Sequence, residues 1–85
     1  DVREPFEAEL ARIEGARLIP LGQLEGAFGE LEDWRDRPIV VHCHHGPRSR
    51  QACQLLISKG FSHVENLDGG IDAWALDVDP SVGRY

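Results

Sequence analysis

The chain has 85 residues, carries a formal net charge of −6 at pH 7, and is 41% hydrophobic and 28% charged. This length suits one small domain, and the composition is that of a folded globular protein rather than a disordered one. The acidic balance argues against non-specific nucleic-acid binding, which needs a net basic surface. No stretch approaches the roughly 18 consecutive apolar residues of a membrane-spanning helix. We therefore expect neither nucleic acid nor a membrane as a partner.

The chain contains no Met and begins at Asp1 inside what reads as a strand, so we expect these residues to be part of a longer protein. The first residues do not resemble a signal peptide. The two cysteines, Cys43 and Cys53, are too few for a disulfide scaffold. We therefore expect two reduced thiols in a cytoplasmic protein.

The sequence pattern of residues 1–19 predicts a strand, a short helix and a second strand. Asp1–Arg3 reads as the stub of a strand, and Glu4–Pro5 opens a short helix, because Pro suits the first helical turn. Spacings of three or four residues predict a buried stripe on this helix, formed by Phe6, Leu10 and Ile13. Arg17–Ile19 reads as a second short strand.

A helix is predicted from about Leu21 to Trp34, because apolar residues recur there at helical spacing. These residues are Leu21, Leu24, Phe28 and Leu31. Three glycines in the segment each weaken a helix by up to about 1 kcal/mol relative to Ala. We therefore expect packing, rather than intrinsic propensity, to hold this segment.

The second half of the chain reads as strand, helix, strand and helix. The apolar run 38–43 predicts a strand covered on both faces. A helix follows from Pro47 or Arg48 to Lys59, ended by Gly60, with its buried side formed by Ala52, Leu55 and Leu56. Val64–Leu67 reads as a strand, and Ile71 begins a last helix to about Leu76 that buries Ile71 and Trp74. This alternation predicts an α/β fold with a mainly parallel sheet.

The segment with the clearest chemistry runs from Cys43 to Ser49. Cys43 ends a buried strand, and a tight loop and a helix N-terminus follow at the edge of the sheet where α/β proteins bind ligands. Loop N–H groups and a helix N-terminus carry partial positive charge and together bind anions. They should lower the pKa of the Cys43 thiol, helped by His44, His45 and Arg48. Cys43 is thus a candidate nucleophile; the alternative is an inert buried cysteine.

The run Cys43-His44-His45-Gly46-Pro47-Arg48-Ser49 resembles the C-x-x-G-x-R-S active-site loop of rhodanese-like sulfurtransferases. Further blocks in the same order resemble this family: Asp1-Val2-Arg3-Glu4-Pro5 with Glu7, Gly15-Ala16, Ile19-Pro20-Leu21, and Asn66-Leu67-Asp68-Gly69-Gly70-Ile71 with Ala73-Trp74. The resemblance covers nearly the whole chain. It implies a rhodanese-like fold, with a small, mainly parallel sheet flanked by helices on both faces.

The resemblance implies that Cys43 carries sulfur as a persulfide, without a metal or organic cofactor. The loop residues that follow would then bind the substrate: His44, His45, Gly46, Pro47 and Arg48. Arg48 would hold a donor sulfonate or, equally, order the loop. Pro47 removes one N–H donor from the loop but stiffens it.

The implied donors are thiosulfate or another protein's persulfide, and the acceptor is thiophilic. The ending 77–85 resembles the tail of rhodanese domains fused behind E1-like adenylyltransferases, which pass sulfur to a ubiquitin-like carrier protein. The family domain also begins with a strand and a helix before the Asp1 strand, so we expect those elements to be missing from a single domain spanning 1–85.

Several other interpretations remain open. A cysteine phosphatase of related fold needs a loop one residue longer than the one between Cys43 and Arg48. A metal site built on 42–45 would need adjacent side chains to converge on one ion, which is rare. A non-catalytic rhodanese-like binding module is the main alternative. We expect His42 to be a core residue, Asp1 and Arg3 to be structural, and Cys53 to be a small buried hydrophobe rather than a resolving thiol.

Overall fold

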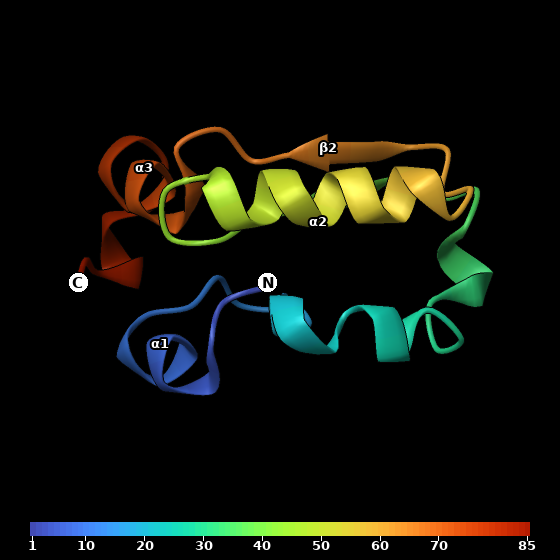
Figure 1. Cartoon of the computed structure of the whole chain (residues 1–85). Coiled ribbons are helices and arrows are strands. Elements are labelled where there is room, and N and C mark those ends of the chain that lie inside the picture. The colour runs from blue at the N-terminus through green and yellow to red at the C-terminus, as the bar shows by residue number, and fades with distance from the viewer.

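The computed structural model describes all residues 1–85, and at its centre lies a parallel pair of short strands. Strand β1 (Ile39–Val41) pairs with β2 (Val64–Asn66), so that Ile39 faces Val64 and Val41 faces Asn66. Helix α2 (Pro47–Ser58) connects the strands and runs beside β2 (Figure 1). The α/β class with a small parallel sheet is therefore confirmed.

Helix α2 follows the prediction closely. It begins at Pro47, which occupies the first helical turn. At its end the Phe61 N–H donates to the Leu56 carbonyl and the Gly60 N–H to the Ile57 carbonyl, which is the pattern of a Schellman cap. Its buried side carries Ala52 and Leu56, as expected.

The prediction of one long helix over 21–34 is wrong. The segment forms three separate 3₁₀ turns, namely η1 (Leu21–Gln23), η2 (Glu25–Ala27) and η3 (Glu32–Trp34). Three glycines within fourteen residues lower helix propensity enough to account for this break. The predicted apolar face nevertheless packs inward, because Leu24 is buried in the core cluster and its apolar neighbours along the segment pack against that cluster.

Helix α1 (Pro5–Leu10) forms where predicted, but its orientation is opposite to the one expected. Phe6 and Leu10 are 64% and 61% exposed, and Ile13 is only half-buried, so the predicted apolar stripe is not buried. The side that faces the protein carries Glu7 instead, which is 5% exposed. Ion pairing of Glu7, described below, therefore outweighs apolar burial in a helix of only six residues.

The predicted strands at Asp1–Arg3 and Arg17–Ile19 are not regular strands, although backbone hydrogen bonds join them to each other and to the segment after β1. The Val2 N–H donates to the His42 carbonyl (3.0 Å), and the Ile19 N–H donates to the Asp1 carbonyl (2.8 Å). The expectation that β1 is covered on both faces is also wrong, because Val40 is 59% exposed. The regular sheet is thus limited to two strands.

The core is one cluster of eight buried residues that joins β1 and α2 with the segments beside them, including Leu24 between η1 and η2. Cys53 belongs to it and is 8% exposed, as predicted for a small hydrophobe. Helix α3 (Gly70–Asp77) buries Ile71, while Trp74 is half-buried, and the turn η4 (Pro80–Val82) follows it. None of the helices is long and apolar enough to cross a membrane.

Arg3 is completely buried, and each of its five N–H donors has a partner. Nε and Nη2 bind the Asp1 carboxylate at 2.9 and 2.8 Å. The remaining donors reach the Ala11 carbonyl (2.8 Å), the Glu7 carbonyl (3.1 Å) and the Tyr85 hydroxyl (2.9 Å). Arg3 thereby joins the N-terminal segment, α1 and the C-terminal segment, and the structural role expected for Asp1 and Arg3 fits this geometry.

We predict that Arg3→Met lowers the free energy of unfolding by about 3–5 kcal/mol, because the Asp1 carboxylate is left buried without its partner. Urea denaturation at neutral pH measures this loss. Arg12, whose side chain is 68% exposed and 3.9 Å from Glu14, provides the control, since Arg12→Met should cost less than about 0.5 kcal/mol. Equal losses in the two variants would contradict the structural role of Arg3.

Candidate functional site

Cys43 lies two residues after the end of β1, in a loop that ends where α2 begins, and is only 1% exposed. The Gly46 N–H donates to its Sγ atom at 3.1 Å. The Ser49 hydroxyl lies 3.4 Å from Sγ, and its single proton is shared with the Gly46 carbonyl (3.0 Å) and the Asn66 Oδ1 atom as alternative acceptors. Burial raises the pKa of the Cys43 thiol, but hydrogen bonds from the Ser49 hydroxyl and from the N–H groups of Ser49, Gly46 and Arg48 more than offset burial, so the pKa is lowered. The loop thus favours the thiolate.

Cys53 offers an internal comparison, because it is also a free and buried cysteine. Burial raises the pKa of the Cys53 thiol, and no opposing hydrogen bond lowers it. The two thiols therefore differ through the loop alone, and only Cys43 has the environment of a nucleophile.

The loop holds its shape through two glycines at positions that other residues would strain. Gly46 has φ +133°, a conformation that side chains rarely adopt, and it turns the chain into α2. Gly70 begins α3, and a Cβ atom there would clash with the carbonyl groups of Cys43 and His44. This close approach lets the Ile71 N–H donate to the Cys43 carbonyl at 2.9 Å. The N-terminus of α3 therefore supports the loop from behind.

Arg48 is held by Glu7 of α1 rather than left free. Its two terminal nitrogens donate to the two Glu7 oxygens at 2.5 and 2.8 Å, and the Tyr85 hydroxyl adds a third hydrogen bond at 2.8 Å. The hydrogen bonds from Arg48 lower the pKa of Glu7 to about 2 despite its burial. Of the two functions considered for Arg48, this geometry favours ordering of the loop.

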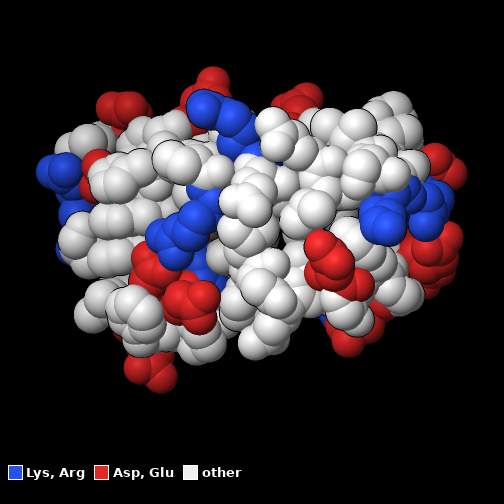
Figure 2. Space-filling view, in the orientation of Figure 1, with Lys and Arg blue, Asp and Glu red and all other residues white.

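The charges around the site are largely neutralised in pairs. Arg3 is bound to Asp1, Arg48 to Glu7, and Arg84 to Asp72. On the face shown in Figure 2, basic and acidic groups are interspersed and no large patch of one sign forms. The positive potential at Cys43 therefore comes mainly from backbone N–H groups and the α2 N-terminus.

His44 and His45 form the outer part of the loop. Their rings lie 4.0 Å apart, and the exposed His45 lies 3.8 Å from the Asp72 carboxylate. The Nε2 atom of His44 is buried and has no hydrogen-bond partner. His42 points into the core, as predicted, and burial together with nearby positive charge lowers its pKa to about 4, so that it is neutral at physiological pH.

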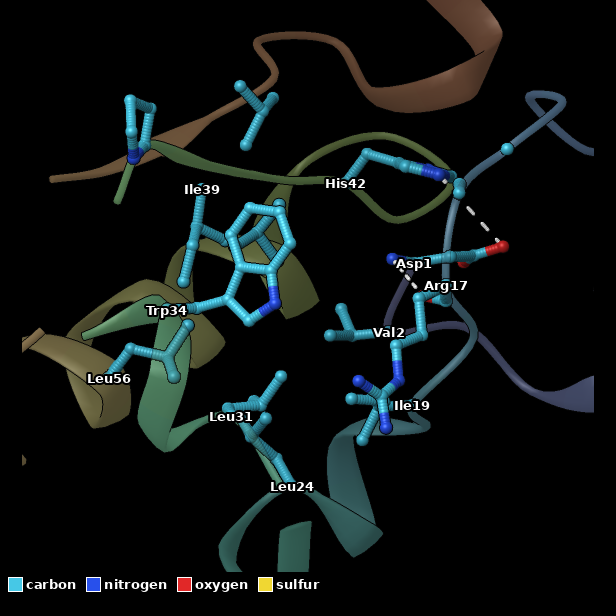
Figure 3. Close-up of a pocket in the computed structure, with 15 residues that line it drawn as sticks. Asp1, Val2, Arg17, Ile19, Leu24, Leu31, Trp34, Ile39, His42 and Leu56 are labelled. Atoms are coloured by element: carbon cyan, nitrogen blue, oxygen red, sulfur yellow. Dashed lines mark hydrogen bonds and ion pairs between the residues drawn. The ribbon is translucent and has the colours of Figure 1, made fainter. Parts of the chain in front are cut away.

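An apolar pocket of about 330 Å³ opens on another part of the surface (Figure 3). Its wall includes Val2, Ile19, Leu31, Trp34 and Ile39. No residue of the loop 43–48 lines it. It therefore cannot serve Cys43 directly.

No group of three or more His, Cys, Asp or Glu side chains is placed to hold a metal ion.

The structure places the predicted site residues in the loop before α2, namely Cys43, His44, His45 and Gly46, and in the first turn of that helix, namely Pro47 and Arg48. Sequence reasoning missed Tyr85 and assigned no function to Glu7, which is the partner of Arg48. It also undervalued Ser49, whose hydroxyl contacts Sγ. The family-like motif around Glu7 was a usable signal, whereas nothing near Tyr85 in the sequence indicated a contact with a loop so distant along the chain.

We predict that Ser49→Ala raises the pKa of Cys43, because it removes a hydrogen bond that favours the thiolate. Less thiolate would then be present at neutral pH, and the pH midpoint of Cys43 alkylation should move upward. Ser58 lies in the same helix and donates to the Leu55 carbonyl, so Ser58→Ala is the control and should leave the midpoint in place. An unchanged midpoint in Ser49→Ala would contradict the assignment.

We predict that Glu7 stabilises the fold in a pH-dependent way. The folded-state pKa of about 2 lies below the ordinary 4.5. The stabilisation is therefore complete above pH 4.5 and disappears as the pH falls toward 2. Urea denaturation should show a larger free energy of unfolding for the wild type than for Glu7→Gln at neutral pH. This difference should close as the pH falls from 4.5 toward 2. The exposed Glu9 of α1, changed in the same way, should show no such gap. A gap of constant size would contradict the ion pair.

Comparison with known proteins agrees with this site. Residues 1–77 match the rhodanese-like domain family. The chain is 38% identical over its whole length to the probable adenylyltransferase/sulfurtransferase MoeZ of Mycobacterium tuberculosis, of which it spans only 22%. It is also 39% identical to a sulfurtransferase of Allochromatium vinosum. That match covers 96% of this chain and 75% of the other protein.

Among solved structures, a rhodanese-related protein from Thermoplasma volcanium superposes with a TM-score of 0.81. The two sequences are 35% identical, and the match covers 91% of this chain and 74% of the other. The similarity thus extends over sequence and fold together. The chain belongs to the rhodanese-like domain family.

Proposed function

We propose that this protein is a sulfurtransferase that carries sulfane sulfur as a persulfide on Cys43. The observation that carries the proposal is the environment of Sγ, where backbone N–H groups and the Ser49 hydroxyl lower the pKa of a buried thiol. A structural cysteine needs no such environment, as Cys53 shows. Family membership and the relatives named as sulfurtransferases support the same reaction class.

In the first half-reaction, the Cys43 thiolate attacks the outer sulfur of thiosulfate. A new S–S bond forms at Sγ, the S–S bond of thiosulfate breaks, and sulfite leaves with the electron pair. No proton moves in this step, because the attacking species is the thiolate form that the hydrogen bonds to Sγ favour. The product is the persulfide anion of Cys43.

In the second half-reaction, a thiophilic acceptor such as cyanide or a thiolate takes the terminal sulfur. The acceptor forms its bond to that sulfur as the persulfide bond breaks, and the electron pair returns to Sγ. Loop N–H groups, such as that of Gly46 at 3.1 Å from Sγ, stabilise negative charge in both states, as an oxyanion hole does. Two half-reactions through one covalent intermediate predict ping-pong kinetics.

The burial of Cys43 restricts the donor. With 1% of the residue exposed, the donor must present a slender end, and both thiosulfate and a persulfide on a flexible protein segment meet this condition. We assign contact with the donor to the loop residues His44, His45, Gly46, Pro47 and Arg48. Within that set, Arg48 acts mainly by fixing the loop through Glu7.

The partners proposed here follow from the relatives. MoeZ combines adenylyltransferase and sulfurtransferase in its name, and a domain of this kind would pass sulfur to a ubiquitin-like carrier protein. Both cysteines are free thiols, a state that the reducing cytoplasm maintains, so we place the reaction there.

We predict that Cys43→Ser reduces thiocyanate formation from thiosulfate and cyanide to the uncatalysed background, because serine is a far weaker nucleophile at neutral pH. The fold should persist, since serine is nearly the same size, and circular dichroism checks this. Cys53→Ser is the matched control and should keep most of the activity. Turnover retained by Cys43→Ser, or lost equally in both variants, would overturn the mechanism.

A further inference from the structure

Tyr85 contacts the active-site loop through its ring and through its hydroxyl. The ring stacks on His44, with centroids 3.9 Å apart and planes 8° apart. The hydroxyl donates to the Glu7 carboxylate at 2.8 Å and accepts a hydrogen bond from Arg3 at 2.9 Å. Tyr85 thus connects the ring of His44, the residue that follows Cys43 in the sequence, with the charged groups that fix α1.

The His44 ring is supported on both faces, by His45 on one and by Tyr85 on the other. Its Nε2 atom is buried and has no partner. An unpartnered buried nitrogen is costly, and a ring free to turn would relieve the cost by moving toward water. The nearly parallel Tyr85 ring opposes that movement and keeps the nitrogen in place.

We propose that Tyr85 is a positioning residue, whose ring holds the imidazole of His44 so that the buried Nε2 hydrogen-bonds an anionic sulfur donor beside Cys43. The inference rests on the proposed function for the identity of the donor. The contact of the Tyr85 hydroxyl with Glu7 and Arg3 serves to anchor the ring. His44 makes the contact with the donor, and Tyr85 acts through it.

Two substitutions separate the ring from the hydroxyl. Tyr85→Phe keeps the stacking surface and loses both hydrogen bonds, whereas Tyr85→Gln keeps a polar group in reach of Glu7 and Arg3 but loses the ring. Tyr85→Leu is a second variant without a ring, should the Gln variant not fold. Arg17→Gln is the control, because the exposed side chain of Arg17 pairs with Glu30, far from His44 and Glu7 in the hydrogen-bond network.

The first measurement is the NMR chemical shift of the His44 ring protons in the protein without donor. A stacked phenol ring shifts them upfield. We expect the shift to persist in Tyr85→Phe and Arg17→Gln and to decrease in Tyr85→Gln, where the His45 ring alone remains beside His44. Loss of the shift in Tyr85→Phe would show that the hydroxyl, and not the stack, orients His44, and would overturn the proposal.

The second measurement is thiosulfate affinity in a Cys43→Ser background, followed by NMR titration of the loop amides, so that no turnover is needed. Removing the Tyr85 ring should weaken thiosulfate binding by about fivefold, whereas the affinity of Tyr85→Phe should stay within about twofold of the unchanged protein. In a His44→Ala background, removing the ring should weaken binding no further, because the two residues act as one unit. Equal weakening with and without His44, or no thiosulfate binding at all, would overturn the proposal.

The two claims can fail separately. If thiosulfate binds as described but Cys43 never gains a sulfur atom, then the proposed sulfur transfer fails while the action of Tyr85 through His44 stands. If Cys43 gains sulfur equally fast with and without the Tyr85 ring, and the titration shows no loss of affinity, then the proposed function stands and the inference about Tyr85 is overturned.

Discussion

A network of hydrogen-bonded charged groups connects the buried Arg3 with the loop that contains Cys43, and the shape of this loop depends on the network. Arg3 and Glu7 meet at the Tyr85 hydroxyl, and Glu7 in turn holds both terminal nitrogens of Arg48. Arg48 is the second residue of α2, so its position fixes the N-terminus of the helix that faces Cys43. Removing one partner of a buried ion pair leaves the other charge uncompensated, so the buried Arg3 and Glu7 hold their partners in a fixed arrangement.

This charged network holds together segments that a larger sheet would otherwise connect. The regular sheet has only two strands of three residues each, and the core cluster has eight residues. Such a small chain has limited apolar area with which to hold its segments together. Arg3 uses its five donors to bind Asp1, α1 and Tyr85 to one another, and the exposed apolar face of α1 shows that ion pairing at Glu7 decided that helix's orientation.

The sequence predicted those features that depend on local pattern. The alternation of helices and strands and the bounds of α2 could be predicted from periodicity and from helix start and stop signals, whereas the assignment of Cys43 as a nucleophile stays a prediction. A continuous helix over 21–34 was predicted wrongly, because apolar spacing does not reveal how far three glycines lower the helix propensity of the segment. The orientation of α1 and the contact of Tyr85 with His44 join residues far apart in the chain, and no single-sequence signal encodes such pairings.

The central claim is that Cys43 accepts a sulfur atom and gives it up again. Intact-mass spectrometry of the reduced wild-type protein tests it most directly, after incubation with thiosulfate and again after adding cyanide. The account predicts a gain of one sulfur atom, located on Cys43 by peptide mapping and removed by cyanide. A folded, reduced protein that gains no sulfur from thiosulfate or from a protein persulfide would contradict it.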